Sequence, residues 1–139
     1  MTLKASELSE GRTFEAVVVE NLTRTQIVQY AGASGDYNPI HTDEVFATQV
    51  AGYPSVFAHG MLTMGMTGRM LTDLVGDGRL LHFGGRFTSQ VFPGDDLTTT
   101  ATVEAVHEGD EPSVDLKVST TNQDGVEVFS GQAAARIDP

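Results

Sequence analysis

The sequence of 139 residues has no cysteine and no tryptophan, and its 8 basic side chains are outnumbered by 19 acidic ones. The absence of cysteine excludes a disulfide framework, a thiolate zinc site and a cysteine nucleophile. The formal net charge of −11 argues against a nucleic-acid binder, which needs a basic face for phosphate. It equally argues against docking on an anionic membrane. Any chemistry must therefore come from carboxylates, imidazoles, hydroxyls or the backbone.

Long hydrophobic runs are also scarce. Residues 1–10 lack the apolar region of a secretory signal. Ser55–Val75 is the one long apolar stretch, but it contains His59, Arg69 and Asp73, which a bilayer centre tolerates poorly. We therefore expect a buried helix there, in a cytoplasmic protein. Because 40% of the residues are hydrophobic and no linker or repeat interrupts the chain, residues 1–139 are predicted to form a single domain.

The first half of the chain predicts a strand followed by helices. Thr13–Glu20 is rich in β-branched residues and predicts a strand. Thr23 precedes Gln26 in a capping box, which predicts a short helix ending by Gly32–Gly35. The remaining expected elements are a turn at Asp36–His41, a short helical stretch at Asp43–Gln49, and the apolar helix at Ser55–Val75.

The second half of the chain shows the alternating pattern of strands. Four are expected, at Leu80–Phe92, Leu97–Val106, Ser113–Thr121 and Val126–Ile137. Their short connections predict an antiparallel meander. The apolar helix has no wide polar face, so we expect it to be largely surrounded. Gly60, Gly65 and Gly68 within it suggest close approach by strands or a partner helix. The expected fold class is α+β.

Two segments in the middle of the chain resemble a known signature. YAGASGDYNPIHTD, from Tyr30, and FAHGMLTMG, from Phe57, are similar to the motifs of MaoC-like dehydratases, the (R)-specific enoyl-CoA hydratases of the hot dog fold. ELSEGRTF and RFTSQVFPGDDL also match, so the resemblance covers nearly the whole chain in the same order. It implies an antiparallel sheet of about five strands around a long helix.

Asp36 and His41 are the candidate catalytic pair. On a helix, residues five apart would diverge by roughly 140°, whereas an Asn-Pro turn lets the two side chains converge. A carboxylate and an imidazole facing one water can both accept and donate protons. The resemblance implies that they are the dyad for syn addition of water to a trans-2-enoyl thioester. Either residue can deliver the proton to the α-carbon. Without the resemblance, the same residues form an ordinary turn.

Three further residues are candidates for binding substrate. Gly60 lies near the amino end of the apolar helix, where free backbone N–H groups and the helix dipole suit a developing oxyanion. The resemblance places that role on Gly60, and the alternative is a packing glycine under a strand. Asn38 either orients the water or thioester, or caps the turn. His59 is expected to position other groups rather than act as a second base.

Other chemistry has little support. His82 and His107 have no partners at ligand spacing, so no metal site is expected, and the two side chains are interpreted as surface or structural. No redox cofactor is implied, since coenzyme A or an acyl carrier protein arrives as part of the substrate. Arg69, Arg86 and Lys117 are candidates for its phosphates by charge alone. The methionines are interpreted as core filler or as the lining of an acyl pocket.

Two rival functions fit the same fold. An acyl-CoA thioesterase would use Asp36 to direct water at the thioester carbonyl, and a subunit of a heteromeric dehydratase would shape the acyl tunnel. Because Asp36 and His41 are both present, we predict a catalytically competent hydro-lyase. The resemblance and the open edge of a single small sheet also imply a dimer, with an identical or a homologous chain.

Overall fold

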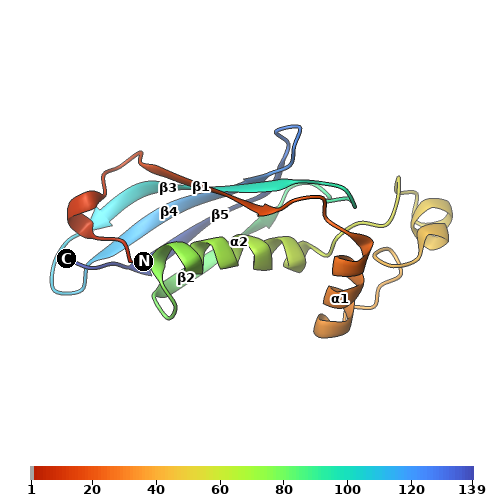
Figure 1. Cartoon of the computed structure of the whole chain (residues 1–139), viewed down its shortest axis with the longest axis horizontal. Coiled ribbons are helices and arrows are strands. Elements are labelled where there is room, and N and C mark those ends of the chain that lie inside the picture. Colours follow the sequence, from red (N-terminus) through yellow and green to blue (C-terminus); the bar gives the residue numbers. More distant parts are fainter. Residues whose placement is uncertain (1) are drawn as a thin grey trace.

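The computed structural model describes residues 2–139, and Figure 1 shows its arrangement. One long helix lies across an antiparallel sheet, and a smaller helical region extends beyond one end of that helix. In chain order, the elements are η1 (Ala5–Glu7), β1 (Thr13–Val19), α1 (Arg24–Ser34), the π-helical turn η2 (Phe46–Val50), α2 (Gly60–Val75), β2 (Leu80–Phe87), β3 (Leu97–His107), β4 (Ser113–Thr121) and β5 (Glu127–Arg136).

The sheet has five strands in the order β1-β3-β4-β5-β2, and every neighbouring pair is antiparallel. The predicted four-strand meander is therefore wrong in part, because β2 pairs with β5 and only β3, β4 and β5 follow one another. Strand β2 also ends at Phe87, five residues before the predicted end. The connector to β3 is held elsewhere, since Ala58 N donates to Val91 O at 2.8 Å and Gly94 N donates to Leu22 O at 2.7 Å. These bonds keep residues 88–96 away from a hairpin with β3.

Helix α2 begins at Gly60, so the prediction of helix from Ser55 is wrong. Ala58 takes part in the bond to Val91, and His59, the residue before the helix, has a non-helical ψ of 137°. The helix is also less enclosed than expected. Its buried residues are Thr63, Thr67, Met70, Leu71 and Val75. Met61, Gly65, Arg69 and Asp73, four residues apart, form an exposed stripe, because the sheet covers only one side of the helix.

Two of the three helix glycines permit close packing against β2. A Cβ on Gly60 would lie 2.7 Å from the Phe87 ring, and one on Gly68 would lie 3.1 Å from the Phe83 ring. A Cβ on Gly65 would meet nothing within 4 Å. The predicted close approach by a strand is confirmed for Gly60 and Gly68 and is wrong for Gly65, which belongs to the exposed stripe.

The main core fills the space between α2 and the inner face of β3, β4 and β5. Val114, Leu116 and Val118 are buried as their alternation predicted, and Phe129 of β5 packs with them. A polar link crosses this core, because Thr120 Oγ1 lies 2.7 Å from the hydroxyl oxygens of both Thr67 and Thr99. Among residues 2–139, no helix combines the length and hydropathy needed to cross a bilayer.

Helix α1 forms as the sequence predicts. Gln26 N donates to Thr23 Oγ1 at 3.0 Å and Thr23 N donates to Gln26 Oε1 at 2.9 Å, which completes the capping box. The helix ends at Ser34, and the capping residue Gly35 has a left-handed φ of 75°, which suits glycine. A second helical stretch covers Glu44–Val50, close to the predicted one. Both stretches lie beyond the amino end of α2 (Figure 1).

Candidate active site

The turn from Asp36 to His41 is held by its own polar groups. Asn38 N donates to Asp36 Oδ1 at 3.2 Å, and Ile40 N donates to Asn38 Oδ1 at 3.2 Å. His41 N donates to the Asn38 carbonyl oxygen at 3.1 Å. These are the local bonds that Asp and Asn typically make in turns. The contacts of Asn38 are therefore those of the turn-capping alternative.

Asp36 and His41 come together across this turn. His41 Nε2 lies 4.0 Å from Asp36 Oδ2, with 8% of the His41 side chain and 53% of the Asp36 side chain exposed. The other ring nitrogen, His41 Nδ1, lies 2.6 Å from the Phe57 carbonyl oxygen. Because a carbonyl oxygen only accepts, Nδ1 donates, and Nε2 of the neutral ring presents a lone pair. A separation of 4.0 Å is too long for a direct hydrogen bond and suits two groups that share one water.

The surroundings of His41 favour its neutral form. Burial lowers the pKa of the imidazole below its ordinary value of 6.5. The Phe57 carbonyl raises the pKa, a positive charge on His59 lowers it, and the Asp36 carboxylate raises it, with a net lowering. His41 is therefore neutral near pH 7 and available as a base.

His59 lies directly behind this pair. Its ring stacks on the His41 ring, with centroids 3.8 Å apart and an angle of 23° between the planes. Its Nε2 lies 3.0 Å from the Asp36 carbonyl oxygen. The residue is 2% exposed, so its ring contacts the turn rather than the solvent-facing side of the site. The role of Phe57 has no signal in the sequence, because it acts through its backbone carbonyl.

A cavity of about 320 Å³ adjoins the amino end of α2. Gly60 and Thr63 of α2 line it together with Phe87 of β2 and residues 88–91 of the connector. The first-turn N–H groups of a helix lack intrahelical acceptors, so this cavity borders potential donors for a substrate oxygen. Gly60 also packs under Phe87. A role as a packing glycine and a role as a donor to an oxyanion are therefore compatible at this position.

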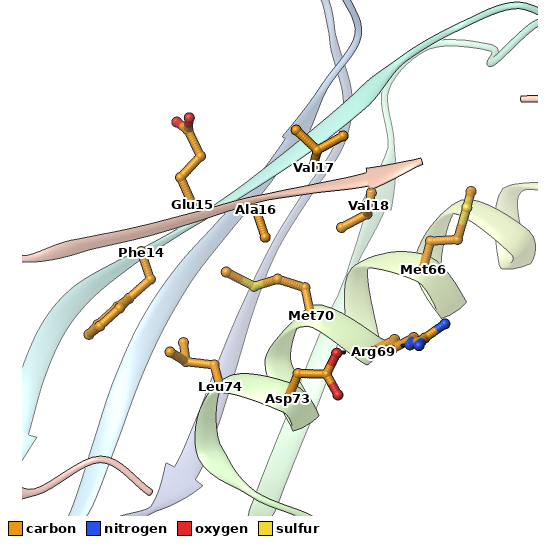
Figure 2. Close-up of a pocket in the computed structure, with 10 residues that line it drawn as sticks. All are labelled: Phe14, Glu15, Ala16, Val17, Val18, Met66, Arg69, Met70, Asp73 and Leu74. Atoms are coloured by element: carbon orange, nitrogen blue, oxygen red, sulfur yellow. Dashed lines mark ion pairs between the residues drawn. The ribbon is translucent and has the colours of Figure 1, made fainter. Parts of the chain in front are cut away.

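A larger cavity of about 600 Å³ lies between β1 and α2, away from the dyad. Figure 2 shows Phe14, Ala16 and Val18 of β1 on the side facing the helix, opposite Met70 and Leu74. Met66 also lines this cavity, and Met64 packs against the main core. Neither Asp36 nor His41 lines it. Met64, Met66 and Met70 are thus divided between core and cavity, and Met61 is exposed.

The cations expected to meet phosphates are not gathered at the dyad. Arg69 lines the larger cavity with its Nε 3.9 Å from Asp73 Oδ2, and neither Arg86 nor Lys117 lines either of these cavities. His107 Nε2 lies 2.7 Å from Asp115 Oδ2 in an exposed pair, which agrees with a surface role.

One group of side chains in the described chain has ligand atoms close enough to consider a metal. Asp36, His41 and His59 each offer one within 4.8 Å of the others. However, the rings of His41 and His59 are stacked with centroids 3.8 Å apart, so their nitrogen lone pairs, which lie in the ring planes, do not converge on one point. We draw no metal chemistry from this group, and the absence of a metal site stays a prediction.

Comparison with known proteins identifies relatives of this chain. The chain is 46% identical over 69 residues to 3-hydroxyacyl-thioester dehydratase Y of Mycobacterium tuberculosis, a match covering 48% of this chain and 24% of that protein. It is 38% identical over 76 residues to the peroxisomal enoyl-CoA hydratase 2 of Arabidopsis thaliana, covering 52% and 24%. The matches thus span about a quarter of the length of these two curated relatives.

A solved structure matches over a larger share of both chains. The (R)-hydratase from A. caviae involved in PHA biosynthesis superimposes with a TM-score of 0.81 at 27% identity, covering 96% of this chain and 98% of that one. This likeness confirms the predicted hot dog fold. These relatives are named hydratases and dehydratases, which are hydro-lyases. The MaoC like domain profile matches residues 6–124, and the chain belongs to this family.

Proposed function

We propose that this protein is a hydro-lyase that reversibly adds water to a trans-2-enoyl thioester, as an (R)-specific enoyl-CoA hydratase or 3-hydroxyacyl-thioester dehydratase. The observation that carries the proposal is the 4.0 Å gap between His41 Nε2 and Asp36 Oδ2. A water molecule between them accepts no proton from the resting pair, because His41 presents a lone pair and Asp36 a carboxylate. Both groups instead draw a proton from the water.

The proton balance of the reaction follows from this resting state. The water oxygen forms a bond to the β-carbon as one of its O–H bonds breaks, and the dyad takes that proton. The electron pair of the double bond moves to the α-carbon and the thioester oxygen. The dyad then returns a proton to the α-carbon, so that H and OH add to one face of the double bond. Since the resting dyad holds no proton in the gap, the water supplies both the hydroxyl group on the β-carbon and the proton on the α-carbon.

Gly60 is the proposed donor to the thioester oxygen. As charge develops on that oxygen, a backbone N–H at the amino end of α2 stabilises it, with help from the helix dipole. The 320 Å³ cavity beside Gly60 is the proposed place for the thioester group. Asn38 supports the reaction by holding the turn, because its side-chain oxygen accepts from Ile40 N. The reaction needs no metal or redox cofactor.

The dyad is tested by an absorbance assay of crotonyl-CoA hydration, extended to longer enoyl-CoAs, with wild type, Asp36→Asn and His41→Ala. Loss of one general acid–base group is expected to lower turnover by roughly 10²–10⁴-fold. The matched control is His107→Ala, which removes an exposed histidine of β3 and should keep wild-type turnover. Near-wild-type turnover in both dyad variants would disprove the dyad. Release of free CoA without hydration would instead indicate a thioesterase.

The partner is proposed on different evidence. We propose a dimer with an identical or homologous chain through β2, one of the two edge strands of the sheet. Strand β2 carries two exposed large apolar side chains, Leu81 at 57% and Phe87 at 47% exposure, and Phe87 also lines the cavity beside Gly60. An unpaired edge of this kind is usually covered in a native protein. The cytoplasmic location stays a prediction.

A further inference from the structure

His59 is a buried histidine that the proposed proton transfers do not use. It is the residue immediately before α2, and its side chain makes no capping bond to that helix. Instead, its Nε2 lies 3.0 Å from the carbonyl oxygen of Asp36, 23 residues earlier in the chain. A carbonyl oxygen only accepts, so Nε2 carries a proton and donates it. The neutral ring therefore has its lone pair on Nδ1, which has no hydrogen-bond partner among the described residues.

Two aromatic rings pack against the His59 ring. One contact is the stack with His41, whose centroid is 3.8 Å away. Another is Tyr30 of α1, whose ring meets it at an angle of 60° with centroids 4.8 Å apart. At 2% exposure, the imidazole has almost no freedom to rotate away from Asp36.

The short segment from Phe57 to His59 thus holds both members of the dyad. The Phe57 carbonyl accepts from His41 Nδ1 at 2.6 Å, and His59 donates to the Asp36 carbonyl. Between them, Ala58 N donates to Val91 O at 2.8 Å, which ties the segment to the connector after β2. The two anchors are two residues apart on this short segment, so together they set the distance between the ends of the turn.

We propose that His59 is a positioning residue: its Nε2–H anchors the Asp36 backbone, and its ring supports the His41 ring, so that His59 sets the gap in which water is activated. This inference rests on the proposed function of Asp36 and His41. Because His59 reaches the carbonyl and not the carboxylate of Asp36, it acts on geometry and leaves the carboxylate free for water. It does not touch the substrate.

The kinetic test compares His59→Phe, which keeps an aromatic ring but removes the donor, with His59→Gln, whose amide N–H can again donate to Asp36 O. A misplaced catalytic group costs on the order of 10²-fold, so His59→Phe should lose about that much kcat with little change in KM. His59→Gln should recover a large part of the loss. The control is His107→Phe, the same replacement at an exposed position of β3. Thermal unfolding of each variant gives the folded fraction by which kcat is corrected.

Two kinetic results would overturn the positioning role. One is wild-type kcat in the corrected His59→Phe variant, because the donor would then be dispensable. The other is an equal loss in His59→Phe and His59→Gln, because restoring a donor would then restore nothing. A loss in His59→Phe that Gln relieves supports the proposal.

A second measurement does not depend on activity. Nitrogen-15 NMR of the wild-type protein should show that His59 carries its proton on Nε2 and its lone pair on Nδ1. A His59 that carries its proton on Nδ1 contradicts the proposal. If the wild-type protein hydrates no enoyl thioester, the proposed function fails, and the NMR result still decides whether His59 anchors Asp36.

Discussion

At the scale of single residues, the two histidines of the site are oriented by backbone carbonyl oxygens. Phe57 O fixes the proton of His41 on Nδ1, and Asp36 O fixes the proton of His59 on Nε2. Each imidazole thus has a defined tautomer without any carboxylate partner at bonding distance. The result is a neutral His41 whose free nitrogen faces Asp36 across the gap for water.

The lowered pKa of His41 predicts the acid side of the pH profile. Only the neutral ring can take a proton from water, so kcat/KM should fall as pH falls, with a midpoint below the ordinary histidine value of 6.5.

The free energy of unfolding should also fall as pH falls. Because the folded state holds the proton less tightly than the unfolded chain, His41 contributes stability that is complete above about pH 6.5 and is lost as pH falls through its lower folded pKa.

This prediction is checked by a pH–rate profile of crotonyl-CoA hydration and by urea unfolding of wild type and His41→Gln over the same pH range. Wild type should lose more stability than His41→Gln between pH 6.5 and the folded pKa of His41. An acid limb with its midpoint above 6.5 would mean that the Asp36 carboxylate outweighs burial at this site.

At the scale of elements, α2 is the support on which the site is assembled. Its amino end borders the cavity beside Gly60, and its flank packs closely on β2 through Gly60 and Gly68. The opposite side of the helix is the exposed stripe that includes Gly65. Gly60 and Gly68 therefore allow close packing on β2, whereas Gly65 does not.

Alanine substitutions test this difference. Gly65→Ala adds a Cβ into open space and should stabilise the protein by up to about 1 kcal/mol, the difference in helix propensity. Gly68→Ala adds a Cβ 3.1 Å from the Phe83 ring, so crowding offsets the same gain. Urea unfolding should rank Gly65→Ala as the more stable of the two variants. Equal stability would show that the Phe83 ring moves aside without an energetic cost. The reverse order would contradict the open space around Gly65.

At the scale of the whole molecule, the sheet order leaves β1 and β2 as edges. Each edge carries one large apolar side chain at 57% exposure, Val17 on β1 and Leu81 on β2. Only the β2 edge adjoins the cavity beside Gly60, through Phe87. Pairing through β2 would therefore bring a second subunit next to the proposed thioester site, whereas pairing through β1 would not.

Matched lysine substitutions test which edge pairs. Sedimentation equilibrium of wild type should give a dimer, Leu81→Lys should shift it toward monomer, and Val17→Lys should leave it unchanged. A buried lysine without a partner is strongly unfavourable in an interface. A dimer lost in Val17→Lys and kept in Leu81→Lys would assign the interface to β1. A stable, active monomer of wild type would contradict the dimer altogether.

Much of the local structure followed from the sequence because its causes are local. The capping box at Thr23 and Gln26 and the alternation of β4 depend on neighbouring residues alone, and both are confirmed. The start of α2 and the partner of β2 were predicted wrongly, because each depends on contacts from distant parts of the chain. Ala58 N donates to Val91 O instead of taking part in a helix, and β2 pairs with β5.

The candidate site divides in the same way. By itself, the sequence determined which groups are available: one carboxylate and one imidazole separated by an Asn-Pro turn, a histidine and glycine at a helix start, and no cysteine. Only the tertiary structure decided their arrangement. It placed the Phe57 carbonyl on His41, stacked His59 behind it, and left a 4.0 Å gap to Asp36. The physical reason is that tautomer, burial and separation depend on atoms up to 23 residues apart, which only folding brings into contact.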